Sequence, residues 1–166
     1  MTTSCTCPAE AGAASCELTA PAGDKVPCPA CQNVGKAVDS VTLKALLAVP
    51  LTEISDASYR FCKTPGCAIV YYAEDRTQRF DESALREVVF QKHPDGDDTF
   101  VCYCFRHTVG SIRREIEIKH SSTAVEFTTI GIQAGRCACD LRNPQGSCCL
   151  GNVRTVVERM LRKSPE

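Results

Sequence analysis

The chain has 166 residues, with 19 Lys and Arg against 20 Asp and Glu, so its formal net charge is −1. This length provides one ordinary domain or two very small ones. The balanced charge, without any basic run, predicts no nucleic-acid-binding surface. No segment is long and apolar enough to span a bilayer, so we expect no membrane insertion.

Cysteine is the outlier, with 13 of 166 residues or about 8%, a level often found in disulfide scaffolds. The N-terminal sequence, however, has neither the basic start nor the apolar run of a secretory signal. The cysteines also fall into close pairs, which suit a single metal centre better than bridges between distant strands. In a reducing cytosol such pairs are metal ligands or redox thiols, so we expect a cytoplasmic protein.

Three regions follow one another along the chain. Residues 1–24 are rich in Ala, Ser, Thr and Pro and are predicted to form a flexible tail. Residues 25–98 form a first module, and residues 99–166 a second that begins after the polar, turn-forming stretch 93–98. Each module is small enough that its apolar core supplies only a few kcal/mol, so bound metal is expected to add stability.

The first module is predicted to contain a helix and short strands. Ser40 can cap a helix that continues to Leu47 with helical apolar spacing. The stretches 59–61 and 68–72 are strand-like and flank the tight turn Lys-Thr-Pro-Gly at 63–66. A third strand is expected near 88–91.

The second module is predicted to be helical. Thr108 can cap a helix carrying Val109, Ile112 and Ile116 on one face. Ser121 or Ser122 can cap a second helix that ends at Gly135. The stretch 143–146 is a turn, and residues 149–162 are predicted to form a third helix with Val153, Val156, Val157 and Met160 on one face.

Two cysteine knuckles in the first module predict a structural zinc site. Cys28-Pro-Ala-Cys31 and Cys62-Lys-Thr-Pro-Gly-Cys67 lie about thirty residues apart and have structural-zinc spacing. Four thiolates fill a tetrahedral shell and leave no open position for water. The alternative is a redox dithiol at Cys28 and Cys31, but the flanking residues predict neither the strand nor the helix of a βαβ unit.

The second module carries its own cysteines. Cys102 and Cys104 are two residues apart in a segment that we expect to be extended, so both side chains would leave the same face. Cys137, Cys139, Cys148 and Cys149 compete for two further positions. Free backbone N–H groups at helix starts and tight turns can stabilise the charge of an iron–sulfur cluster, while a second zinc ion is the alternative.

The Cys-x-Cys segment resembles the bacterioferritin-associated ferredoxin family, a small helical [2Fe–2S] module. Over about residues 26–160, the order of motifs resembles the N-terminal region of iron–sulfur-type CopZ copper chaperones. These motifs are the two knuckles, Val101-Cys-Tyr-Cys and Asn143-Pro-Gln-Gly-Ser-Cys-Cys. The resemblance implies Zn²⁺ on the knuckles and a [2Fe–2S] cluster on Cys102, Cys104, Cys139 and Cys149, with Cys137 and Cys148 as alternates.

The combined expectation is an α+β fold with a small zinc-stapled β-containing module followed by a helical [2Fe–2S] module. The CopZ resemblance implies one-electron transfer in copper handling, such as reduction of Cu(II) to Cu(I), in a protein that is not otherwise an enzyme. It implies a copper carrier or copper-transporting ATPase and an electron donor as partners. A ferredoxin-like partner of an unrelated reductase and a cluster-based sensor or interaction protein are the alternatives.

Copper carriage itself is a separate question. Those chaperones also have a C-terminal domain with a Met-x-Cys-x-x-Cys loop, which the sequence up to Glu166 lacks. A separate protein, or the tail cysteines Cys5, Cys7 and Cys16, would have to carry copper, since thiolates suit soft metals. The alternative for the tail is that these are stray thiols.

Overall fold

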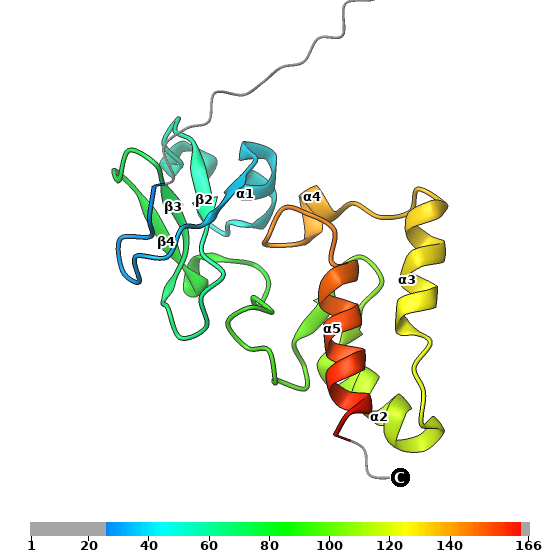
Figure 1. Ribbon diagram of the computed structural model, residues 1–166. Coiled ribbons are helices and arrows are strands. Elements are labelled where there is room, and N and C mark those ends of the chain that lie inside the picture. Colours follow the sequence, from blue (N-terminus) through cyan, green and yellow to red (C-terminus); the bar gives the residue numbers. More distant parts are fainter. Residues whose placement is uncertain (1–25, 164–166) are drawn as a thin grey trace, which may run out of the picture.

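The computed structural model describes residues 26–163, so the predicted tail and its cysteines lie outside the described residues. A small antiparallel sheet lies at one end of the molecule and a group of helices at the other (Figure 1). The short helix α4 (Cys139–Arg142) lies between them. The predicted α+β fold class is confirmed.

The sheet has four strands in the order β1-β2-β3-β4, and each strand pairs antiparallel with the next. The bounds are Lys36–Val38 for β1, Tyr59–Phe61 for β2, Ile69–Ala73 for β3 and Arg79–Asp81 for β4. The predicted strands at 59–61 and 68–72 are confirmed as β2 and β3. Every residue of β3 is buried, which makes it the centre of the first core.

Helix α1 (Ser40–Leu46) is also confirmed, and it buries Thr42, Leu43 and Leu46. Ser40 is its first residue and not its cap, since the N-cap position belongs to Asp39. Two short 3₁₀ turns follow in this half, Leu51–Glu53 and Glu82–Ala84.

The strand predicted near residues 88–91 is wrong. These residues form no strand, and the fourth strand of the sheet is β4. The reason is that side chains bind the backbone here. The Val89 N–H donates to the Glu82 carboxylate at 2.7 Å, and the Phe90 N–H donates to the Tyr103 hydroxyl at 3.0 Å.

The second half begins with a two-stranded ribbon, β5 (Phe100–Cys102) and β6 (His107–Thr108), followed by helices α2 (Val109–Lys119), α3 (Ala124–Gln133) and α5 (Leu150–Leu161). Thr108 caps α2 through a reciprocal pair of hydrogen bonds with Ser111, as predicted. The N-cap of α3 is Thr123, one residue beyond the predicted serines. Gly135 follows α3 with φ of 65°, the left-handed conformation that ends helices.

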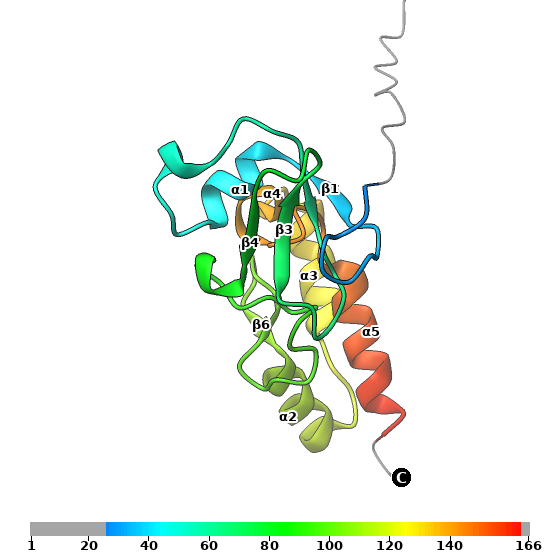
Figure 2. The same ribbon diagram turned by 90° about the vertical axis from the view of Figure 1, so that its left-hand side faces the viewer.

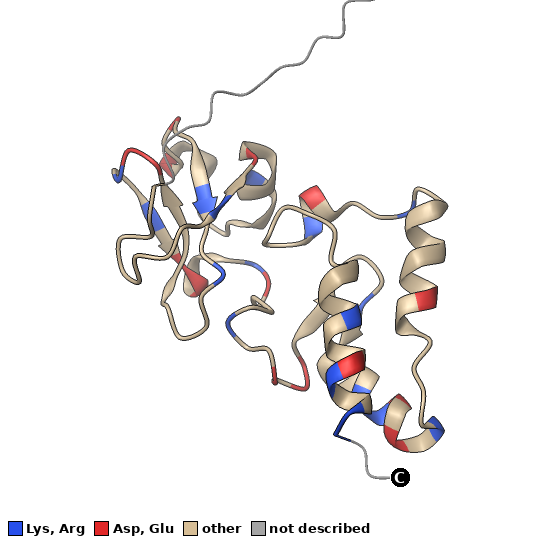
Figure 3. Ribbon diagram, viewed as in Figure 1, with Lys and Arg blue, Asp and Glu red and all other residues tan. Residues whose placement is uncertain are grey.

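Helix α5 organises the second core because it packs against α2, α3 and β5 (Figure 2). Its buried residues are the four predicted from spacing: Val153, Val156, Val157 and Met160. Acidic and basic residues are interspersed along both halves (Figure 3). Within residues 26–163, every helix is too short or too polar to cross a membrane.

The two halves touch where α4 packs against α1 and where Gly146, in the turn at 143–146, lies against Val38 and Thr42. The buried Tyr71 hydroxyl of β3 donates a 2.7 Å hydrogen bond to the Pro144 carbonyl, 73 residues further along the chain. Burial raises the pKa of Tyr71, which therefore stays a neutral donor. This bond ties the centre of the sheet to the turn that precedes α5.

We predict that Tyr71→Phe lowers the free energy of unfolding by about 1–3 kcal/mol, because the Pro144 carbonyl would lose its buried donor. Urea unfolding followed by circular dichroism measures this. Tyr59→Phe is the matched control, since the Tyr59 hydroxyl bonds to Ser55 within the first half and does not bridge the halves. If Tyr71→Phe left the helical signal and the midpoint of urea unfolding unchanged, the bond would not couple the two halves.

Candidate metal centres

The first candidate centre lies at one end of the sheet, where two loops meet. Cys28 and Cys31 belong to the loop closed by the bridge between Pro27 and Val34, and Cys62 and Cys67 to the loop between β2 and β3. The sulfur atoms of Cys28 and Cys67 are 3.8 Å apart, and those of Cys31 and Cys62 are 3.6 Å apart. All four sulfurs lie within 4.8 Å of one another.

Tight turns aim these thiols at a common point. In the first loop the Gln32 N–H donates to the Cys28 carbonyl at 2.9 Å, and Gln32 itself has φ of 60°. In the second loop the Cys67 N–H donates to the Thr64 carbonyl at 3.3 Å, and Gly66 has φ of 73°. Glycine adopts this left-handed conformation without the strain that a Cβ atom would add.

The spacing fits a single tetrahedral metal ion. Zinc–sulfur bonds of about 2.3 Å place the corners of a tetrahedron about 3.8 Å apart. The measured contacts of 3.6 and 3.8 Å match this edge. Cys28 and Cys62 are buried and the other two thiols are half-buried, so the donor set closes around the ion. Such a closed four-sulfur shell is typical of structural zinc.

Three of these thiols, Cys28, Cys31 and Cys67, do not ionise alike without a cation. Burial raises the pKa of Cys28, and it raises that of Cys67 to about 12. Burial also opposes ionisation of Cys31, but hydrogen bonds with Thr64 and the Asn33 backbone lower its pKa to about 6. A divalent cation removes this conflict, since it neutralises the charge of neighbouring thiolates.

The second candidate centre is assembled from four elements. Cys102 ends β5, Cys104 lies in the turn before β6, Cys139 begins α4, and Cys149 is the N-cap of α5. The Cys102 and Cys149 side chains are buried, and those of Cys104 and Cys139 are half-buried. The segment around Cys102 and Cys104 was predicted to be extended throughout. This is wrong for Cys104, which lies in a turn that contains Arg106 with φ of 62°.

Contacts between the sulfurs bring these four residues together. The Cys104 and Cys139 sulfurs are 3.8 Å apart, and the Ala138 N–H donates to the Cys104 sulfur at 3.3 Å. A hydrogen bond with the Cys149 thiol lowers the pKa of Cys102 to about 7 and that of Cys139 to about 6. The same contact with Cys102 raises the pKa of Cys149, and burial raises that of Cys104 to about 11.

The alternates, Cys137 and Cys148, differ from each other in burial, and the Cys137 thiol contacts that of Cys139. Cys148 is exposed, whereas its neighbour Cys149 is 1% exposed. Cys137 is half-buried, and burial raises its pKa. Within the described residues, the thiol that contacts the Cys104 sulfur is that of Cys139.

Close packing of α3 fixes the turn that holds Cys104. A Cβ atom at Gly131 would lie 2.2 Å from the ring of Phe105, the residue after Cys104. The Phe105 ring also makes an edge contact with Phe127, with centroids 6.0 Å apart. Gly131 therefore allows α3 to approach the turn more closely than any larger residue would permit.

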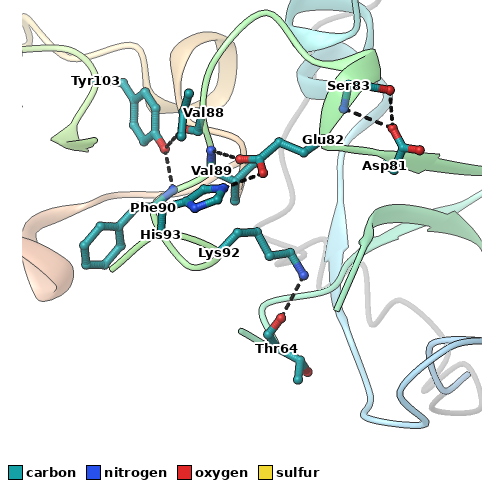
Figure 4. Close-up of polar contacts among 10 residues, drawn as sticks. All are labelled: Thr64, Asp81, Glu82, Ser83, Val88, Val89, Phe90, Lys92, His93 and Tyr103. Carbon is teal, nitrogen blue, oxygen red and sulfur yellow. Dashed lines mark hydrogen bonds and ion pairs between the residues drawn. The ribbon is translucent and has the colours of Figure 1, made fainter. Parts of the chain in front are cut away.

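One segment, residues 88–93, contacts the loops of both centres (Figure 4). The Tyr103 hydroxyl, between Cys102 and Cys104, donates to the Val88 carbonyl at 2.8 Å and accepts from the Phe90 N–H. On the other side, Lys92 Nζ donates to the Thr64 carbonyl, between Cys62 and Cys67, at 2.9 Å. His93 pairs with Glu82 at 2.6 Å.

Several supporting groups were not predicted from the sequence. Thr64 accepts a hydrogen bond from the Cys31 thiol at 3.4 Å, and the Ala138 N–H binds Cys104. Lys92 and Tyr103 act across 28 and 15 residues of chain, so no local pattern marks them. Only the cysteine pairs themselves carry a sequence signal.

Comparisons with known proteins agree with this geometry. Residues 25–86 match a family described as a zinc binding domain, of the CopZ type. The chain is 30% identical over 122 residues to the copper chaperone CopZ of Archaeoglobus fulgidus. That alignment covers 74% of this chain and 57% of the relative, so the chain spans little more than half of its length.

A solved structure shares the fold. The X-ray structure of the CopZ N-terminal domain from Archaeoglobus fulgidus superposes with a TM-score of 0.64 at 28% identity, covering 78% of this chain and 96% of that domain. The resemblance to the N-terminal region of CopZ-type copper chaperones, predicted from the cysteine motifs, is confirmed. The first half is a zinc binding domain with a four-cysteine site.

We predict that zinc binding to metal-free protein at pH 7 releases protons. The raised pKa values keep Cys28 and Cys67 protonated at this pH, whereas zinc requires thiolates. Affinity should therefore fall as the pH falls, because protons compete with the metal. Calorimetric titration in buffers of different ionisation enthalpy measures the release. A heat that is independent of the buffer would contradict this proton balance.

Proposed function

We propose that the chain is a cytoplasmic heavy-metal-handling protein that binds Zn²⁺ at Cys28, Cys31, Cys62 and Cys67 and a [2Fe–2S] cluster at Cys102, Cys104, Cys139 and Cys149. In this proposal it transfers single electrons, and its substrate is Cu(II), which is reduced to Cu(I). The observation that carries the proposal is the presence of two separate four-thiol sets of different compactness.

The compactness of the sets supports two different centres. Within residues 26–163, the first set is the only group of three or more Cys, His, Asp or Glu side chains whose ligand atoms lie close enough together to hold a single metal ion. The second set is more spread out, yet it contains a 3.8 Å pair, Cys104 and Cys139. A binuclear cluster has this character, because two irons share four thiolates. Cys102, Cys104, Cys139 and Cys149 would together hold the two irons.

The chemical surroundings of the second set also favour a cluster. Cys149 caps α5, where the free N–H groups of the first turn stabilise negative charge. The Ala138 N–H donates to the Cys104 sulfur, the kind of bond that tunes iron–sulfur centres. When bound, a [2Fe–2S] cluster supplies one-electron chemistry, which zinc cannot.

The four ligands differ in burial, so the proposed centre has one side in the core and one side nearer to solvent. Cys102 and Cys149 lie in the second core, so this side excludes water. Cys104 and Cys139 are half-buried, so electrons would enter and leave on their side. One electron from a donor protein converts one Cu(II) to one Cu(I), and no proton is consumed.

The zinc centre has a structural role in this proposal. Its closed shell leaves no position for copper or water. Through Thr64, Lys92 and the segment 88–93 it also supports the Tyr103 side chain of the second centre.

Copper as the substrate rests on the similarity to a copper chaperone. Cu(I) formed here would pass to a separate copper carrier or a copper-transporting ATPase. The tail cysteines Cys5, Cys7 and Cys16 are the other possible acceptors in this scheme, since thiolates suit Cu(I). A ferredoxin-like role with an unrelated reductase, or a sensor role, would use the same cluster without copper.

We predict that anaerobically purified protein is red-brown and contains about two irons and one zinc per chain. After reduction, stoichiometric Cu(II) should restore the oxidised spectrum while a Cu(I)-specific chelator reports one Cu(I) per cluster. Colourless protein with two zinc ions would contradict the cluster. A reducible cluster that Cu(II) does not oxidise would favour the ferredoxin-like alternative.

We predict that the later cysteines differ sharply when substituted. Cys139→Ala and Cys149→Ala should bleach or severely destabilise the cluster. Cys137→Ala and Cys148→Ala, the matched controls, should leave its absorption spectrum largely intact, because neither residue belongs to the proposed ligand set. If Cys139→Ala kept the cluster spectrum and Cys137→Ala lost it, the third ligand would be Cys137 and not Cys139.

A further inference from the structure

Thr128, in the middle of α3, is a buried polar residue that lacks a partner. Its side chain is 0% exposed, and its hydroxyl has no hydrogen-bond partner within the described residues. A hydroxyl buried in this way costs about 1–3 kcal/mol unless something accepts its proton. Most buried polar groups in native proteins are satisfied, so this one calls for an explanation.

The neighbouring threonine shows that the position matters. The Thr129 hydroxyl donates to the Val125 carbonyl of its own helix at 2.8 Å, which is a common way for a helical threonine to be satisfied. Thr128 does not make the corresponding bond. Its hydroxyl is held on the face of α3 that points into the second core, together with Ala124 and Gly131.

That face lies against the second candidate centre. Ala124 belongs to the same core cluster as Cys102 and Cys149, and Gly131 contacts Phe105 beside Cys104. Thr128 lies between Ala124 and Gly131 on this face, so its buried hydroxyl lies on the side of α3 that covers the loop of Cys102 and Cys104.

We propose that Thr128 is a positioning and tuning residue whose hydroxyl donates a hydrogen bond to the Cys102 sulfur when that sulfur is a cluster ligand. The inference rests on the proposed [2Fe–2S] centre and identifies a group that sets its reduction potential. A neutral thiol is a weak acceptor, so the hydroxyl has no adequate partner without metal. A thiolate is a much stronger acceptor, and a bond to a charged group is about twice as strong as a neutral one.

The sign of the effect follows from charge. Reduction adds one negative charge to the centre, and part of it resides on the cysteine sulfurs. A donor aimed at a sulfur therefore stabilises the reduced state more than the oxidised state and raises the potential. The low local dielectric strengthens the bond, because both Thr128 and Cys102 are fully buried.

The test compares the reduction potential of the full-length, cluster-loaded protein with those of three variants by optical redox titration. Thr128→Val keeps the shape but removes the donor, so its potential should be more negative than that of the wild type. Thr128→Ser keeps the donor and should restore the potential most of the way. Thr42→Val is the matched control, since Thr42 is also 0% exposed with an unpartnered hydroxyl but lies in α1, and its potential should not change.

The outcomes separate this inference from the proposed function. A wild-type protein without iron overturns both. A wild-type cluster whose potential is unchanged in Thr128→Val overturns the inference alone. If Thr128→Val does not retain the cluster, Thr128→Ala takes its place because it adds no bulk, and equal potentials for the Ala and Ser variants overturn the inference.

Discussion

The cost of ionising closely packed, buried thiols is the constraint on which the rest of this structure depends. Sulfur atoms 3.6–3.8 Å apart cannot all carry charge in a half-buried site, and the pKa values show the conflict. In the first set one thiol has a pKa of about 6 and another of about 12. Each half has a small core and short elements. Because the free energy of cation binding adds to the free energy of folding, we expect the cation to supply a large share of the stability of each half.

The sequence predicted those parts of the fold that depend on local signals. Thr108 and Ser111 form a cap from neighbouring residues, and the apolar spacing of α5 repeats within one helix. The error at residues 88–91 has a non-local origin, because Glu82 and Tyr103 satisfy backbone groups that a strand would have paired. Likewise, strands β1 and β4 are only three residues each, too short for a periodic pattern to mark them in the sequence.

The candidate sites divide in the same way. Close cysteine spacing identified both thiol sets, since ligands of one centre come in pairs on tight loops. The residues that surround them could not be found from spacing. Thr64 and Thr128 look like ordinary threonines in the sequence, and only the fold places one hydroxyl beside Cys31 and leaves the other buried without a partner. Gly131 is significant only because Phe105 lies against it.

The segment 88–93 has a thermodynamic consequence, because it is bonded to Thr64 in one metal loop and to Tyr103 in the other. If an ion at the first loop stabilises this segment, the same free energy increases the affinity of the second centre for its metal. Linkage makes such a coupling reciprocal, so loss of the second centre would weaken the first by the same factor. Two sites that share no ligand would then behave as cooperative sites of a single binding polynomial.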